Sequence, residues 1–253
     1  MHIDRKSKIA MTPPRFKCDA CISAQIEYPL PSRSYFMTLI GSAGSGKTSL
    51  MVNMLRSPQC YKKAYHHVHL VIPPHSLASL DMKMFKKHDK CYDELDFATL
   101  DKIHEKAMAA SDENEFSLLV IDDQTAALKD RDVQRLMKLL IYNRRHLRLS
   151  IIMLVQSYNA IPLPVRKTIS HFAMLRPRNK KEYEAIFKEL IFLDPQTADD
   201  MMRFIFRDRY DFMFCDVEKS LFFRNFDRIK LNAEEDHFES QDQEANQEGG
   251  GGP

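Results

Sequence analysis

Short apolar runs recur along the chain, and amphipathic stretches separate them. The runs are rich in β-branched and aromatic residues, which predicts buried strands. We expect strands at 35–40, 66–72, 116–121, 150–155 and 171–175. In the intervening stretches, apolar residues recur three and four positions apart, which predicts helices with one buried face. We expect helices at 49–55, 77–87, 97–110, 130–142, 179–192 and 196–207, with Asp96 as the N-cap of the helix at 97–110.

Strands that alternate with helices predict an α/β fold, with a mostly parallel central sheet covered by helices on both faces. Two final apolar runs, at 211–215 and 221–226, predict a C-terminal β-hairpin. Residues 1–32 are polar, basic and proline-containing, which indicates an N-terminal extension. The apolar pattern ends at about residue 233, so we expect a domain at 33–230 and a disordered acidic tail at 231–253.

Composition and charge narrow the class of protein. A chain of 253 residues can bury a full core. No apolar run reaches the ~20 residues that a membrane helix needs, and no export signal is visible. The five scattered cysteines fit a reducing compartment. The net charge of +2 conceals an asymmetry, because residues 231–253 carry seven acidic groups and no Lys or Arg. Residues 1–230 therefore hold 37 basic against 28 acidic groups, a net +9, which fits a polyanionic partner.

A glycine-rich loop follows the first predicted strand and precedes the first predicted helix. Residues 41–48 read G-S-A-G-S-G-K-T, which fits the phosphate-binding pattern G-x-x-x-x-G-K-[ST]. The chain has seven glycines, and those outside this loop all lie at 249–252, so the clustering indicates a backbone that a ligand approaches closely. An ordinary glycine turn is the alternative. The predicted nucleotide-binding residues are Gly41, Ser42, Ala43, Gly44, Ser45, Gly46, Lys47, Thr48 and Ser49.

Polar residues follow two later strands, at the edge of a parallel sheet where ligands bind. Lys47 would neutralise the β- and γ-phosphates of ATP, while Thr48 and Asp122 would hold Mg²⁺. Asp123 could act as the general base, and Gln156 could sense the γ-phosphate or orient water. A capped strand end is the alternative for the two aspartates. The order of the motifs favours a sheet in which a further strand separates the two motif strands.

Phosphoryl transfer also needs positive charge near the reacting phosphate. Arg144, Arg145 and Arg166 are candidates, and solvated arginines at a helix end are the alternative. Basic residues at 62–63, 86–87 and 176–181 could either be solvated or contact a phosphate backbone.

Two further groups of residues invite a metal interpretation. Cys18 and Cys21 form a lone C-x-x-C, and we interpret them as ordinary thiols. The histidines at 66, 67, 69 and 75 lack a placed carboxylate or cysteine partner, so solvent-facing or hydrogen-bonded histidines are favoured.

Taken together, these motifs resemble the DNA-packaging ATPases of poxviruses and other large DNA viruses, in the FtsK–HerA class of P-loop motors; similar proteins occur in virophages and Polinton-like elements. The resemblance covers roughly residues 33–230 and rests on residues 41–48, 118–123, 143–146, 150–157 and 161–162. It implies a RecA/FtsK-like P-loop NTPase fold and a ring of subunits that pumps double-stranded DNA into a preformed capsid. Many members of the wider class have Asp-Glu where this chain has Asp122-Asp123.

The sequence thus predicts a Mg²⁺-dependent ATPase that translocates double-stranded DNA for genome packaging. Expected partners are DNA, further copies of the chain in a pentameric or hexameric ring, and portal or vertex proteins of a viral capsid. The expected location is inside the infected host cell, with association with the virion a further option. We expect Arg145 to act on the nucleotide of a neighbouring subunit. A small-molecule or nucleotide kinase and a nucleotide-regulated assembly module are the alternative functions.

Overall fold

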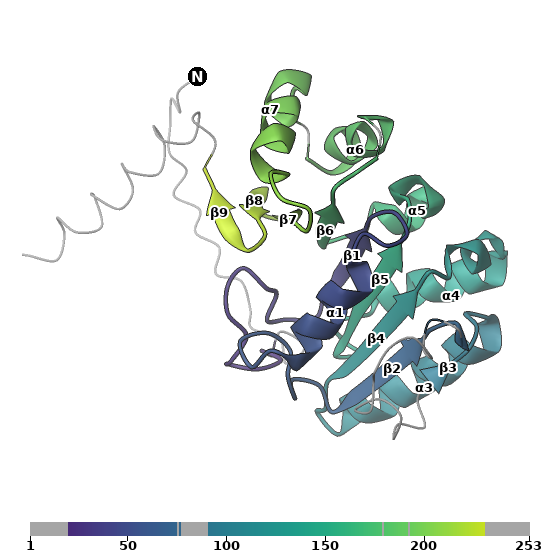
Figure 1. Ribbon diagram of the computed structural model, residues 1–253. Coiled ribbons are helices and arrows are strands. Elements are labelled where there is room, and N and C mark those ends of the chain that lie inside the picture. The colour runs from purple at the N-terminus through teal and green to yellow at the C-terminus, as the bar shows by residue number, and fades with distance from the viewer. Residues whose placement is uncertain (1–19, 75, 77–90, 179, 192, 231–253) are drawn as a thin grey trace, which may run out of the picture.

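The computed structural model describes residues 20–74, 76, 91–178, 180–191 and 193–230. Within them, a nine-stranded sheet has the order β3-β2-β4-β5-β1-β6-β7-β8-β9 (Figure 1). The strands are β1 (Phe36–Ile40), β2 (His67–Val71), β3 (Cys91–Tyr92), β4 (Ser117–Asp122), β5 (Leu149–Val155), β6 (His171–Leu175), β7 (Phe212–Asp216), β8 (Leu221–Arg224) and β9 (Asp227–Ile229). The described α-helices are α1 (Lys47–Arg56), α3 (Phe97–Asp112), α4 (Arg131–Tyr142), α5 (Leu163–Arg166), α6 (Lys180–Ile186) and α7 (Pro195–Ile205).

The strand that leads into the glycine loop lies in the middle of the sheet. β1 is parallel to β5 on one side and to β6 on the other. β5 is also parallel to β4, so one strand separates the two motif strands, as expected. The register pairs Ile40 with Val155 and Asp122 with Leu154. The glycine loop, Asp122 and Gln156 therefore meet at one edge of the sheet.

The sheet changes direction after β6. β6, β7, β8 and β9 pair antiparallel in sequence, so the predicted terminal hairpin is confirmed and extended by a short third strand. Because β7 runs opposite to β6, Phe212 at its start pairs with Leu175 at the end of β6. The beginning of β7 therefore lies at the same edge as the carboxyl ends of the parallel strands.

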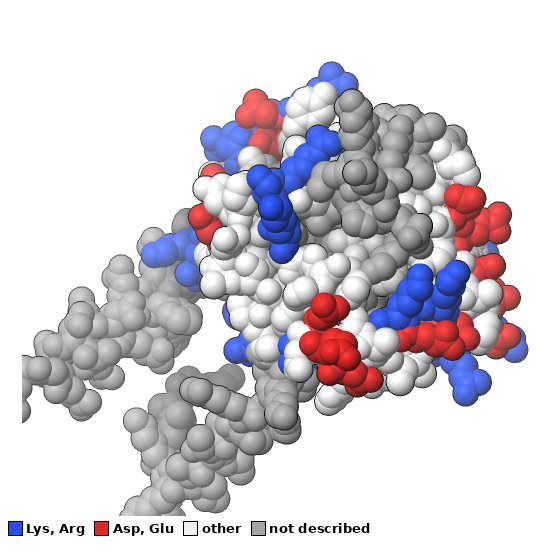
Figure 2. All heavy atoms as spheres, turned by 90° about the horizontal axis from the view of Figure 1, so that it is seen from below, with Lys and Arg blue, Asp and Glu red and all other residues white. Residues whose placement is uncertain are grey.

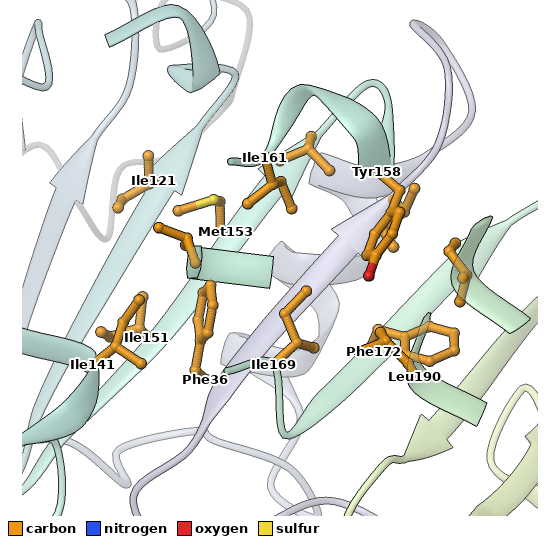
Figure 3. Close-up of a cluster of buried hydrophobic side chains, with 14 of the residues drawn as sticks. Phe36, Ile121, Ile141, Ile151, Met153, Tyr158, Ile161, Ile169, Phe172 and Leu190 are labelled. Atoms are coloured by element: carbon orange, nitrogen blue, oxygen red, sulfur yellow. The ribbon is translucent and has the colours of Figure 1, made fainter. Parts of the chain in front are cut away.

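Alternating side chains of the sheet form two separate cores. Phe36 and Ile40 of β1 face a cluster that includes side chains of α3, α4, α6 and α7, and Figure 3 shows part of it. Met37 and Leu39 point to the opposite face, where Met51 and other residues of α1 cover them. Helices thus cover both faces, as predicted (Figure 1). Burying a large apolar side chain contributes about 1.5–3 kcal/mol, so these clusters fix the strand register.

Side-chain caps define where several helices begin. The carboxylate of Asp96 accepts from the Thr99 amide at 2.7 Å, which confirms the predicted N-cap of α3. Asp130 caps α4, and Asp194 caps α7 just before Pro195. The helix predicted at 179–192 is divided instead: α6 ends at Ile186 and a π-helical turn, Phe187–Ile191, follows it. Residues 179 and 192 lie outside the described part of the chain.

Some predictions fall on segments that the structure does not describe. These are the helix at 77–87, Cys18, most of the N-terminal extension and the acidic tail. Of the extension's described residues, Ile22 and Leu30 are buried in the same core as α1. No described helix is long and apolar enough to cross a membrane.

Candidate functional site

The glycine loop has a backbone that other residues would not adopt easily. Gly44 and Gly46 have φ values of 72° and 104°, in the left-handed region. At Gly41, an added Cβ would lie 2.7 Å from the Ser45 Oγ and 3.0 Å from the Leu175 Cβ, so a side chain there would clash. Gly46 precedes α1 and provides no side-chain cap. The first amides of α1 are therefore positioned to bind an anion.

Lys47 folds back against the loop that it follows. Its Nζ donates hydrogen bonds to the carbonyl oxygens of Gly41 (2.6 Å) and Ser42 (3.0 Å). Burial lowers the pKa of Lys47, and the negative charges of Asp122 and Asp123 oppose that shift. The loop carbonyls thus hold the ammonium next to the space that the loop encloses.

Thr48 and Asp122 lie together at the start of α1 and the end of β4. The Thr48 hydroxyl donates to the Asp122 Oδ2 at 3.5 Å, a weak hydrogen bond. Asp122 is only 5% exposed, and its pKa is raised by burial and by the neighbouring Asp123. A buried carboxylate beside a hydroxyl supplies the oxygen ligands that Mg²⁺ prefers, so these residues fit the predicted metal site.

Asp123 and Gln156 meet across the ends of two adjacent strands. The Gln156 side-chain amide donates a hydrogen bond to the Asp123 Oδ2. Asp123 has a φ of 54°, a left-handed conformation that is uncommon for residues other than glycine. Its backbone amide donates to the Leu154 carbonyl at 3.1 Å, which holds the turn in place. The structure therefore brings the predicted general base and the predicted γ-phosphate sensor into contact.

A cavity of about 390 Å³ opens beside this pair and reveals two cations that the sequence did not single out. Arg178 and Lys181, just before and within α6, line it together with Ser42 and Gln156. From the sequence alone, the basic residues at 176–181 are expected either to be solvated or to contact a phosphate backbone. Glu182 also lines the cavity, and burial raises its pKa against the opposing charge of Lys47. Both cations therefore lie on the Gln156 side of the glycine loop.

The three arginines proposed from the sequence lie elsewhere. Arg145 is exposed in the turn that precedes β5, at the opposite end of that strand from Gln156. Arg144 donates to the Ile141 carbonyl at 3.1 Å and lies 3.7 Å from a carboxylate oxygen of Glu218. None of the three lines the cavity beside Gln156.

Arg166 has a structural role in this conformation. Its Nε and Nη2 donate to the two oxygens of Glu189, at 2.7 and 2.8 Å. The same carboxylate accepts from Tyr158 at 3.0 Å, and the guanidinium carbon lies 5.2 Å from the centre of the Tyr158 ring. Arg166 therefore ties α5 to the π-helical turn after α6.

His66, His67 and the described cysteine of the C-x-x-C have ordinary partners, while His69 is fully buried and stacks against Tyr92. His66 accepts from the Phe116 amide at 3.0 Å, and His67 pairs with Glu115. Cys21 is exposed and its thiol donates to the Ser23 carbonyl at 3.3 Å. Among the described residues, no group of three or more His, Cys, Asp or Glu could hold a metal ion; His75 and Cys18 fall outside them.

On the face that Figure 2 shows, the described basic residues do not form one continuous patch. Figure 2 shows Lys and Arg in separate groups on one face, interspersed with acidic and uncharged residues. Part of this view is occupied by residues that the structure does not describe. Residues 1–19 and 77–90, which the structure does not describe, carry five of the nine net positive charges of residues 1–230, so the described residues carry a net +4.

Comparison with known families identifies the chain. The profile of the poxvirus A32 protein family matches residues 27–246. The chain belongs to the poxvirus A32 family. The match includes the glycine loop, both aspartates, Gln156 and Arg145, so every predicted site residue lies inside the A32 region. Among curated protein sequences, none matches the chain.

Solved structures share the fold of this A32-family chain. The DNA-packaging ATPase B204 of Sulfolobus turreted icosahedral virus is 17% identical, with a TM-score of 0.57, over 76% of this chain and 97% of B204. The genome-packaging NTPase B204 of Sulfolobus turreted icosahedral virus 2, solved with ATP-γS, is 16% identical, with a TM-score of 0.55, over 77% of this chain and 98% of B204.

A bacterial ATPase domain has a similar fold. The cytoplasmic domain of the Thermomonospora curvata type VII secretion ATPase EccC is 13% identical, with a TM-score of 0.52, over 78% of this chain and 24% of that longer chain. At these identities the comparison establishes the fold alone. That fold is the P-loop ATPase fold expected from the motifs.

Proposed function

We propose that this A32-family protein hydrolyses ATP to drive double-stranded DNA into a preformed viral capsid. The family match and the shared fold support this proposal. The B204 proteins with that fold are described as a DNA-packaging ATPase and a genome-packaging NTPase, the latter in complex with ATP-γS. The observation that carries the proposal is the Asp123–Gln156 contact at the same edge of the sheet as the phosphate loop, because it joins a candidate base to a candidate γ-phosphate sensor.

The loop and its lysine would bind the triphosphate. The amides at the start of α1 would donate to phosphate oxygens, with the helix dipole favouring negative charge there. Lys47 would exchange the carbonyls of Gly41 and Ser42 for oxygens of the β- and γ-phosphates. Little rearrangement is needed, because its side chain already lies against the loop.

Asp123 and Gln156 would act on the water that attacks the γ-phosphate. Thr48 and Asp122 are the residues that would hold Mg²⁺, which neutralises phosphate charge when it is bound. Asp123 would accept the proton of the water, and Gln156 would hold both in line. Because Gln156 donates a hydrogen bond to Asp123, a substitution at Gln156 would also alter the position of the candidate base.

Positive charge would reach the γ-phosphate from two directions. Arg178 and Lys181 of the same chain line the adjacent cavity. Arg145, at the opposite end of β5 from Gln156, would serve a neighbouring subunit instead. That arrangement requires copies of the chain in a ring, pentameric or hexameric, which would dock on portal or vertex proteins of the capsid inside the infected cell.

One experiment tests the proposal directly. ATP hydrolysis would be measured with and without linear duplex DNA, with Mg²⁺ present, alongside the mass of the oligomer. We expect turnover that duplex DNA stimulates, and Lys47→Ala protein that folds but does not turn over. Conversion of ATP to ADP only in the presence of a small acceptor, with transfer of the phosphoryl group to that acceptor, would instead indicate a kinase. Binding of ATP without turnover under any condition would indicate an assembly module.

A further inference from the structure

A second cavity borders the phosphate loop on the side away from Gln156. It has a volume of about 400 Å³. Gly46 and Ser49 form its wall on the loop side, while Leu175, Tyr210 and Phe212 form the wall on the sheet side. It shares no lining residue with the cavity that contains Arg178 and Gln156. The loop therefore has a cationic cavity on one side and a largely apolar, aromatic cavity on the other.

The strand order gives the two cavities different roles. β5 and β4, which lead to Gln156 and Asp122, lie on one side of β1. β6 and β7, which end or begin beside the second cavity, lie on the other side. A triphosphate whose last phosphate faces Gln156 must extend in the opposite direction along the edge of the sheet. The part of the ligand beyond the first phosphate then reaches the second cavity.

Tyr210 is the side chain in this cavity best suited to an aromatic ligand. It is 64% exposed, although large aromatic rings are usually buried. It also lies next to the loop, because a Cβ added at Gly46 would be 3.8 Å from the Tyr210 Cδ1. The Arg209 guanidinium carbon lies over the ring, 5.3 Å from its centre, and the Tyr210 side chain also lines the cavity.

The polar groups of the cavity fit a ligand that is not wholly apolar. Ser45, which also lines it, has a buried hydroxyl with no hydrogen-bond partner among the described residues. Asn53 lines it one helical turn beyond Ser49 and supplies an amide that can donate and accept. A flat aromatic ring with hydrogen-bonding edges, attached to a phosphate chain, satisfies both features.

We propose that this cavity binds the base of the nucleoside triphosphate and that Tyr210 stacks on that base. The proposal rests on the proposed ATPase function and identifies a part of its substrate site that the sequence motifs do not reach. Stacking a base on an aromatic side chain contributes enough that its removal weakens binding by about 5- to 150-fold. The phosphates remain with the loop and Lys47.

Calorimetric titration with ATP and with inorganic tripolyphosphate, both with Mg²⁺, separates the base from the phosphates. We expect Tyr210→Ala to weaken ATP binding about tenfold or more and to leave tripolyphosphate binding unchanged. Tyr210→Phe should retain the ring and the affinity for ATP. Phe204→Ala is the matched control, because Phe204 is 46% exposed and Arg207 stacks on it at 4.8 Å, outside both cavities. It should bind ATP like the wild type.

The outcomes distinguish the base-pocket proposal from the proposed ATPase function on which it rests. Equal ATP affinity in wild type and Tyr210→Ala, or equal weakening of ATP and tripolyphosphate, would overturn the base pocket alone. Loss of ATP affinity in Tyr210→Phe as well would assign the effect to the hydroxyl and overturn the stacking. Wild-type protein that binds neither ATP nor tripolyphosphate would overturn both proposals. Circular dichroism melts of each variant confirm that the comparison is made between folded proteins.

Discussion

Gln156 donates a hydrogen bond to Asp123 across the carboxyl ends of β5 and β4. The two residues are 33 positions apart in the chain, and each directly follows a strand, β4 for Asp123 and β5 for Gln156. Their contact occupies one oxygen of the candidate base and leaves the other for a water molecule. It also makes the two side chains a unit, so their contributions to turnover are expected not to add.

The first prediction tests whether Asp123 and Gln156 act together in turnover. Asp123→Asn should retain ATP binding but lower kcat by about 100-fold or more, because an amide cannot accept the proton of water. Gln156→Ala should also lower kcat, and the double variant should be little worse than Asp123→Asn. Steady-state phosphate release and ATP titration measure both quantities. Strictly additive losses in the double variant would show that the two residues act independently.

The second prediction concerns how much folding stability is lost when the buried Asp122 carboxylate is ionised. Burial and Asp123 raise its pKa, so its ionised form is less stable in the folded state than in the unfolded state. The folded protein loses stability as pH rises from 3.8, the ordinary pKa of an aspartate, through the raised pKa, and it carries the full cost at neutral pH. Asp122→Asn removes that cost.

Thermal melts without nucleotide, taken from pH 4 to pH 7.5, test this cost. The Tm of Asp122→Asn should exceed that of the wild type at neutral pH, and the difference should shrink towards pH 4. The same variant should lose Mg²⁺-dependent ATP binding, unlike Asp123→Asn. A wild type that is more stable than Asp122→Asn at neutral pH would show that the carboxylate stabilises the empty fold.

The third prediction concerns the cation beside the γ-phosphate in the same chain. Arg178→Ala should lower kcat and weaken ATP binding more than ADP binding, because Arg178 lines the Gln156 side of the loop. Arg228→Ala, a change at an exposed arginine of β9, is the matched control and should behave like the wild type. Competition titrations with ATP and ADP measure the ratio of the two affinities. An unchanged ratio in Arg178→Ala would exclude contact with the last phosphate.

The fourth prediction concerns Arg145, which β5 separates from Gln156. If Arg145 serves a neighbouring subunit, Arg145→Ala and Lys47→Ala should each be inactive alone. Mixed rings of the two would contain some interfaces with both an intact phosphate loop and an intact arginine. ATPase activity should therefore reappear on mixing, measured after native mass spectrometry has confirmed mixed oligomers. Mixed rings without recovery would place the action of Arg145 within its own chain.

The fifth prediction concerns DNA. The net +9 charge of residues 1–230 should give binding that weakens steeply with salt and depends little on sequence. Residues 233–253 are acidic and should compete for the same surface, so their deletion should tighten binding at low salt. Fluorescence anisotropy over a range of salt concentrations measures both effects. Affinity that is insensitive to salt would contradict the electrostatic explanation, and unchanged affinity after deletion would contradict the competition.

Periodicity was sufficient to predict the parts of the fold whose signal is local. β1, β4 and β5 are mostly apolar runs, and the predicted cap at Asp96 lies at the start of a helix with one buried face. β3 and β9 were missed because strands of two and three residues carry no alternation to detect. The division of the helix at 179–192 depends on packing around Phe187, which the pattern of the sequence does not encode.

In the site, too, residues with a local sequence signal could be predicted and residues that depend on the packing of distant segments could not. The loop and the aspartates could be predicted because their chemistry depends on neighbours in sequence. Arg178 and Tyr210 could not, because each reaches the loop only through the order of strands in the sheet. Arg166 was a reasonable candidate until its bidentate pairing with Glu189, 23 residues away, became visible. Side chains that approach a site from distant segments leave no spacing for a pattern to detect.

The shortness of the outermost strands has a consequence for assembly. β3 has two residues and β9 has three, and Asp227 and Arg228 of β9 are exposed and charged. Short, charged edges are poor templates for backbone pairing with another chain. Among the described residues, neither edge strand is a good template for pairing with a tenth strand from a neighbouring chain. Subunits that met at these edges would recognise one another through side chains, and such an interface could open and close without breaking a shared sheet.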